Sequence, residues 1–119
     1  MRHRKKTKIL GRKKQPRELM LRNLASSIFM YEKVKTTETK AKTVRSLVEK
    51  LITIAKKNDL TSKRRLIKVL PQTLAVKKLI EVLSKRYQKK SGGYTRIIKL
   101  GNRQGDGAKI VQIELVDAK

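Results

Sequence analysis

The stretch that decides the fold runs from Lys33 to Lys57 and reads KVKTTETKAKTVRSLVEKLITIAKK. Its first five residues are rich in β-branched side chains, which favours a short strand over 33–37. From Glu38 onward, apolar residues recur every three or four positions, which predicts an amphipathic helix over 38–57. Thr36 or Thr37 can cap this helix, because a hydroxyl can accept a hydrogen bond from a free N–H of the first turn.

On the N-terminal side of this stretch, the sequence predicts a helix over 17–31. Pro16 suits the first turn of a helix, and Glu18 suits the positive end of the helix dipole. Leu21, Leu24 and Ile28 follow at helical spacing.

On its C-terminal side, we expect two further helices, over 60–70 and 73–88, with Pro71 between them. Asp59 or Thr61 can cap the first of the two. Two strands are predicted over 94–100 and 109–116, because apolar and polar residues alternate in the second.

The order helix, strand, three helices, two strands predicts an α+β fold of two layers, in which helices cover a small sheet. Residues 16–119 then form a single globular domain. Residues 1–15 contain eight Lys and Arg and not one acidic residue. This segment has too little apolar surface to fold by itself, so we expect an extended basic N-terminal arm that becomes ordered only on binding.

Composition excludes several classes of protein. The chain has 119 residues, of which 33 are Lys or Arg and 9 are Asp or Glu, giving a net charge of +24. It has no Cys, which rules out a thiol nucleophile, a disulfide scaffold and a cysteine-bound zinc site. No apolar run reaches the length of a membrane span, and residues 1–17 contain no apolar core of a signal peptide. We therefore expect a soluble, intracellular protein.

Catalytic chemistry is poorly represented. His3 is the only histidine and lies in the arm, so no His-based catalytic set or metal site can be assembled around it. The glycine-rich loop over 101–108 lacks the Lys-Ser/Thr ending of a phosphate-binding loop and precedes a strand, not a helix. We expect no enzyme activity, no cofactor, no metal and no small-molecule substrate.

The excess of positive charge recurs along the whole chain, which indicates a polyanionic partner. Aromatic residues are few, and we expect Phe29 and Tyr31 at the core or its edge. Tyr94, which follows two glycines and precedes Arg96, is the best candidate for base stacking. Because stacking platforms are scarce, the composition favours a structured RNA recognised by shape and phosphate over a single strand.

Several motifs, in order and at matching spacing, resemble the bacterial large-subunit ribosomal protein seventeen family over essentially the whole chain. The start Met1-Arg2-His3 is similar to that family's start. Residues 34–42 are similar to its signature of Thr-Thr followed by Lys-Ala-Lys. Residues 92–97, with Gly-Gly-Tyr-Thr-Arg-Ile, and residues 113–117 resemble its late strands. One departure is the segment Lys14–Arg17, where many members have Ser-Ser-His-Arg; the hydroxyl cap is missing here, and we expect Pro16 to start the helix instead.

The resemblance implies the same element order, contact with large-subunit ribosomal RNA and neighbouring ribosomal proteins, and a place near the exit of the peptide tunnel in the cytoplasmic ribosome. Combining it with the charge pattern, we expect three groups of RNA-binding residues, in the arm and first helix, around the start of the second helix, and near the late strands. They are Arg2, His3, Arg4, Lys5, Lys6, Lys8, Arg12, Lys13, Lys14, Arg17, Arg22 and Asn23; Lys35, Thr36, Thr37, Lys40 and Lys42; and Tyr94, Arg96 and Arg103.

Two alternatives stay open at this point. A DNA-bending nucleoid protein would share the basic composition, but it would need a dimer interface and an apolar wedge at a ribbon tip, and the 101–108 loop offers no such wedge. An RNA-processing enzyme is the other, and the missing His and Cys chemistry argues against it.

Overall fold

The computed structural model describes residues 14–116, and the predicted helix and strand at its centre are confirmed. β1 (Lys33–Thr37) leads directly into α2 (Glu38–Lys57). The apolar stripe of α2, from Ala41 to Ala55, is buried as the spacing predicts. α2 ends at Asn58, whose backbone is left-handed at φ 52°. Asn tolerates this conformation better than most side chains, which explains the stop at this residue.

Four further helical segments surround α2: α1 (Lys14–Tyr31), α3 (Leu60–Val69), α4 (Thr73–Lys78) and α5 (Ser84–Arg86). α1 starts three residues before the predicted position, with Pro16 inside its first turn. A proline is tolerated there because first-turn N–H groups have no intrahelical partner. At α3, the Asp59 carboxylate accepts a hydrogen bond from the Ser62 N–H at 2.7 Å, so Asp59 is the cap.

The predicted single helix over 73–88 is interrupted. A π-helical turn, η1 (Leu79–Leu83), separates α4 from α5, and the helix ends at Arg86. In a regular α-helix, Lys78 and Arg86, eight residues apart, would be rotated by roughly 80° from each other. A π-turn accommodates about one extra residue, so it brings the two side chains to the same side of the helix. Both contact the carboxylate of Glu32.

The sheet has three antiparallel strands in the order β1-β3-β2, with β2 (Thr95–Asn102) and β3 (Lys109–Leu115) forming a hairpin. β2 therefore extends two residues beyond the predicted strand. Its register shifts between Lys99 and Gly101, and Gly101 has a φ of 132°. Glycine reaches this conformation without strain, which allows the hairpin to continue past the irregularity.

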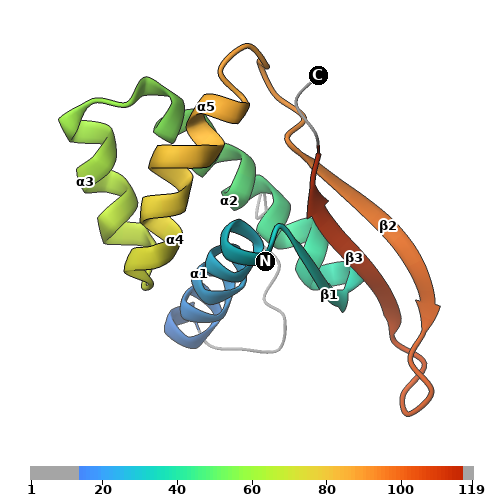
Figure 1. Cartoon of the computed structure of the whole chain (residues 1–119). Coiled ribbons are helices and arrows are strands. Elements are labelled where there is room, and N and C mark those ends of the chain that lie inside the picture. The colour runs from blue at the N-terminus through green and yellow to red at the C-terminus, as the bar shows by residue number, and fades with distance from the viewer. Residues whose placement is uncertain (1–13, 117–119) are drawn as a thin grey trace, which may run out of the picture.

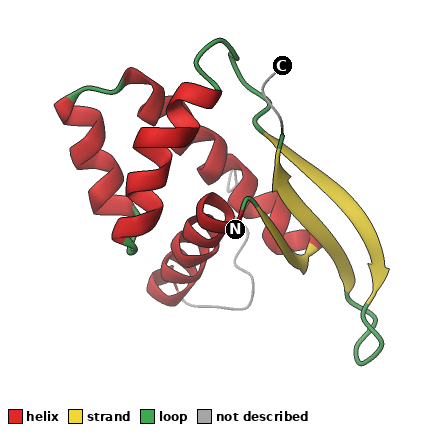
Figure 2. Cartoon of the chain, in the orientation of Figure 1, coloured by secondary structure: helices red, strands yellow, loops and turns green. Residues whose placement is uncertain are grey.

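Helices and sheet form the two predicted layers, so the α+β fold is confirmed. The helices lie on one side of the sheet, and the β2–β3 hairpin extends beyond them (Figures 1 and 2). Val111, Ile113 and Leu115 of β3 are buried, while the intervening residues are more exposed. The core thus lies between this face of the sheet and the helices, and the other face carries exposed Lys33, Lys35 and Arg96.

Candidate nucleic-acid interface

The few carboxylates of the described part of the chain are mostly used for internal contacts. Residues 14–116 contain 25 Lys and Arg and 8 Asp and Glu, which leaves a net charge of +17. Six of these eight carboxylates accept hydrogen bonds from side chains or backbone of the same chain: Glu32, Glu38, Glu49, Asp59, Asp106 and Glu114. Most of the positive charge is therefore left to act outward.

Glu32 joins three segments of the fold. It follows α1 in a left-handed conformation at φ 65°, and its carboxylate accepts hydrogen bonds from Arg86 and, at 2.9 Å, from Lys78. The Arg86 guanidinium and the Lys78 ammonium lower the pKa of Glu32 from 4.5 to about 2. A left-handed conformation is costly for a non-glycine residue. The two ion pairs explain why a glutamate stands at this position.

Glu49 and Glu114 fix the hairpin in a similar way. The Glu49 carboxylate, on α2, accepts hydrogen bonds from the backbone N–H groups of Gly93 and Thr95, both at 3.2 Å, and from the Thr95 hydroxyl at 2.9 Å. Glu114 pairs with Arg96 across the β2–β3 ladder. The Arg96 contact lowers the pKa of Glu114. Both carboxylates hold β2 in position.

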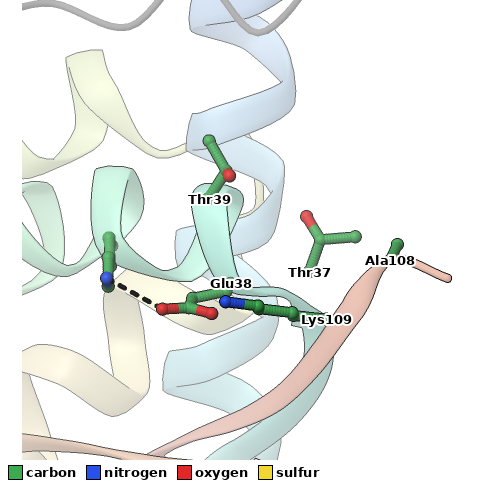
Figure 3. Close-up of a pocket in the computed structure, with 6 residues that line it drawn as sticks. Thr37, Glu38, Thr39, Ala108 and Lys109 are labelled. Carbon is green, nitrogen blue, oxygen red and sulfur yellow. Dashed lines mark ion pairs between the residues drawn. The ribbon is translucent and has the colours of Figure 1, made fainter. Parts of the chain in front are cut away.

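A hollow lies where the start of α2 meets the start of β3. Its lining residues are Thr37, Glu38, Thr39, Lys42, Ala108 and Lys109 (Figure 3). Thr37 is the N-cap residue of α2, but its side chain makes no capping hydrogen bond. The predicted cap position is thus confirmed, while the predicted hydroxyl cap is not formed. A helix N-terminus with hydroxyls nearby is an arrangement that favours anions.

Lysines surround the one carboxylate in this hollow. Glu38 forms an ion pair with Lys42 at 2.8 Å, which is the main reason its pKa is lowered, and Lys109 and Lys99 add to the effect. In Figure 3 the Lys109 ammonium lies beside the Glu38 side chain. Three cations against one anion leave this end of α2 positively charged.

A second hollow adjoins the first along the exposed side of α2. Its lining residues are Lys42, Arg45, Ser46, Glu49 and Gly93. Lys42 lines both hollows, so they follow each other along the helix. Lys42, Arg45 and Ser46 are exposed, and the Glu49 carboxylate is already bound to the N–H groups of the β2 start. An anion in this hollow would meet two cations and a hydroxyl.

The predicted site residues are only partly brought together. Lys42 and Thr37 line the first hollow. Of the others, the half-buried ones are Arg17, Arg22, Thr36 and Lys40. The exposed ones are Asn23 on α1 and Lys35 on the outer face of β1. Arg2, His3, Arg4, Lys5, Lys6, Lys8, Arg12 and Lys13 lie outside the described residues, and Lys14 begins α1.

The predicted cluster near the late strands is separated. Arg96 is paired with Glu114 on β2, whereas Arg103 lies beyond the strand and pairs with Asp106 at 2.5 Å. The Arg103 contact lowers the pKa of Asp106 well below its usual range. Both arginine side chains remain more than half exposed, so they can reach a phosphate without unfolding the hairpin.

The interpretation of Tyr94 as a stacking platform is wrong. Its side chain is 1% exposed and packs against the ring of Tyr87, with 5.2 Å between centroids. Its hydroxyl accepts a hydrogen bond from Lys56 at 3.0 Å and donates one to a backbone carbonyl. Tyr31, expected at the core or its edge, is instead 68% exposed. Phe29 is fully buried, as predicted.

The structure adds three basic residues to those predicted: Arg45, Lys99 and Lys109. Arg45 lies three positions after Lys42, so helical periodicity could have placed it on the same face. Lys99 and Lys109 reach Glu38 from the two strands of the hairpin. No local signal in the sequence could have found them, because their closeness to Glu38 depends on how the hairpin packs against α2.

Residues 14–116 offer neither a cluster of metal ligands nor a membrane-spanning helix. Within this range, no group of three or more His, Cys, Asp or Glu side chains is placed to hold a metal ion. No helix in the same range is long and apolar enough to cross a bilayer.

Known proteins similar to this chain are ribosomal proteins, as a basic chain with an RNA partner would predict. The sequence model of the family described as "Ribosomal protein L17" matches residues 20–116. Two similar relatives, both named "Large ribosomal subunit protein bL17", come from Syntrophotalea carbinolica and Pelobacter propionicus. Each is 47% identical over 98% of this chain, covering 76% and 92% of the respective relative. A protein of the same name from Clostridium botulinum is 46% identical over 90% of this chain and 95% of its own length. The chain therefore belongs to the ribosomal protein L17 family.

Proposed function

We propose that this chain is a structural protein of the bacterial large ribosomal subunit, in the cytoplasm, and that it binds folded ribosomal RNA through phosphate contacts beside neighbouring ribosomal proteins. The observation that carries the proposal is the division of charge: six of the eight carboxylates of residues 14–116 are held by hydrogen bonds within the chain, while cations gather around the start of α2. The assembly, the large ribosomal subunit, is taken from the names of the relatives. Members of this ribosomal protein family are structural components, not enzymes.

The two hollows on α2 suit consecutive phosphates of a folded RNA. Lys42 stands between them, Lys109 and the helix N-terminus serve the first, and Arg45 serves the second. Each phosphate that a cation neutralises releases condensed counterions, which supplies much of the binding free energy. In the sequence, the eight cations of residues 1–15 extend the same chemistry beyond the globular domain.

Association with the large ribosomal subunit can be tested by co-sedimentation of the tagged chain from a bacterial lysate at moderate salt. We expect it to travel with large subunits. Recovery with the nucleoid would favour the DNA-binding alternative, and recovery in the unbound fraction would refute both.

The phosphate contacts can be tested by measuring affinity for large-subunit RNA as a function of salt. We expect Lys42→Gln with Lys109→Gln to flatten the slope of log affinity against log salt by roughly 1.4 to 1.8, because each lost contact removes about 0.7 to 0.9. The matched control carries Lys77→Gln and Lys85→Gln, two exposed lysines of α4 and α5 that line neither hollow. Equal losses in both variants would refute the hollows as the binding site.

The arm is tested separately by deleting residues 1–15. This deletion should lower the affinity and flatten the slope further, because up to eight phosphate contacts are removed. A slope equal to that of the full chain would refute the role of the arm.

A further inference from the structure

The solvent-facing side of α1 carries a row of residues spaced four apart: Leu19, Asn23, Ser27 and Tyr31. Residues four apart are neighbours on a helix surface, and the row winds by roughly 40° at each step, so Ser27 is the closest of the three to Tyr31 around the axis. Leu19 and Tyr31 are 56% and 68% exposed, Asn23 is exposed and Ser27 is half-buried. The row thus presents an amide, a hydroxyl and an aromatic ring toward solvent, and no charge.

Tyr31 differs from the other aromatic residues of the chain. Phe29 and Tyr87 are fully buried and Tyr94 is 1% exposed, so these three rings belong to the core. Only Tyr31 can offer a ring face to a ligand in solution. The Tyr31 ring is not needed to hold the turn that follows α1, because backbone and Glu32 contacts hold that turn.

The backbone on both sides of Tyr31 is fixed. The Met30 carbonyl accepts a hydrogen bond from Lys78 at 3.0 Å, and the Glu32 N–H donates to the Ile28 carbonyl at 2.8 Å. The Glu32 carbonyl accepts from the Leu115 N–H at 2.8 Å. These contacts tie the residues beside Tyr31 to α4 and β3. A ring carried on a fixed backbone loses little freedom on binding, which favours affinity.

Cations follow directly in the chain. Lys33 and Lys35 are exposed and alternate along β1, so they share its outer face at a spacing of roughly 7 Å. This face is not covered by the helices (Figure 1). Glu114, opposite Lys33, is already paired with Arg96. An aromatic ring is therefore followed by two cations available to phosphates.

We propose that Tyr31 stacks on an unpaired base of the ribosomal RNA, and that Lys33 and Lys35 bind the phosphates that flank this base. An exposed ring that is followed in the chain by two exposed cations, with the Ser27 side chain one helical turn away, matches the way proteins bind splayed-out RNA bases. The inference rests on the proposed function and adds to it a contact with a base, where the hollows of α2 contact only phosphates.

The test compares Tyr31→Ala and Tyr31→Phe in binding to large-subunit RNA stripped of protein. Ile67→Ala on α3 is the matched control, because Ile67 is 64% exposed and lies on another helix. We expect Tyr31→Ala to weaken binding roughly 5- to 150-fold, as removal of a stacking ring does elsewhere. Tyr31→Phe and Ile67→Ala should stay close to the unaltered chain. The salt slope should be the same in all of them, since no charge is removed.

A second measurement reports stacking directly. The chain has no Trp, so Tyr31→Trp introduces a single indole whose emission should be quenched by the stripped RNA. Unchanged affinity of Tyr31→Ala, equal losses in the Ala and Phe variants, or an unquenched indole at saturating RNA would each overturn the inference. An indole that responds only to the protein-containing particle would assign Tyr31 to a protein neighbour. If the unaltered chain failed to bind RNA, the proposed function itself would fall.

Discussion

Glu32→Gln is the substitution that tests how this fold is held together. The Glu32 side chain is 37% exposed, and its partners Lys78 and Arg86 are 26% and 29% exposed. A fall in pKa from 4.5 to about 2 would be worth about 3 kcal/mol in a buried site. Solvent screening reduces this, so we expect Glu32→Gln to cost about 2 kcal/mol. In a domain of this size that lowers the melting temperature by roughly 8 to 16 °C.

The pH dependence gives the sharper readout. The pKa of Glu32 is lower in the folded state than in the unfolded state, so its contribution is fully present above about pH 4.5 and is lost as the pH falls toward 2. Urea unfolding followed by circular dichroism should show the unaltered chain and Glu32→Gln converging over this range. The control is Glu81→Gln, because Glu81 is exposed on η1. Its free energy of unfolding should differ from that of the unaltered chain by a constant amount at every pH. A constant difference between Glu32→Gln and the unaltered chain down to pH 2 would refute the ion-pair explanation.

Three further predictions concern single side chains. Phe29→Ala should cost about 3 to 5 kcal/mol in urea unfolding, because the ring is fully buried and its removal leaves a cavity. Tyr94→Phe should cost about 1 kcal/mol by removing the hydroxyl that Lys56 contacts, and it should leave RNA affinity unchanged because the ring lies in the core. Arg103→Ala should leave the melting temperature unchanged, since Arg103 and Asp106 are both more than half exposed, and it should flatten the salt slope of RNA binding by about 0.7 to 0.9.

Periodicity predicted the secondary structure well where local sequence decides it. The bounds of β1 and α2 agree with the predicted ranges, and Asp59, one of two predicted caps, is the cap of α3. The π-turn at 79–83 was not predicted, because the residues around it fit a regular helix. The contact that accompanies it is long-range: Lys78 and Arg86, on either side of the turn, both bind the carboxylate of Glu32, which follows another helix.

The candidate site was harder to predict because composition reveals charge but not exposure. Tyr94 and Tyr31 illustrate the limit. Tyr94 follows a turn signal and was expected at the surface, whereas Tyr31 flanks an apolar stripe and was expected at the core or its edge. The structure shows the reverse, with Tyr94 buried and Tyr31 exposed. The sequence around Tyr94 marks a turn but does not say which face of β2 it begins on. Its burial results from packing against Tyr87, a residue on another element.

Salt should act in opposite directions on the folding and on the RNA binding of this chain. With 25 basic against 8 acidic residues over 14–116, repulsion among unpaired cations outweighs the attraction within the few ion pairs. Raising the salt from about 0.1 M to about 1 M shortens the Debye length from about 10 Å to about 3 Å, which screens that repulsion. We therefore expect the melting temperature of the free protein to rise with salt while its affinity for RNA falls. The comparison uses sodium chloride, since sulfate would also stabilise by exclusion from the surface. A melting temperature that fell with sodium chloride would mean that the ion pairs of Glu32, Glu38 and Glu114 dominate the electrostatics of the fold. RNA phosphates would then contribute to binding only, and they would not reduce any electrostatic repulsion that destabilises the free protein.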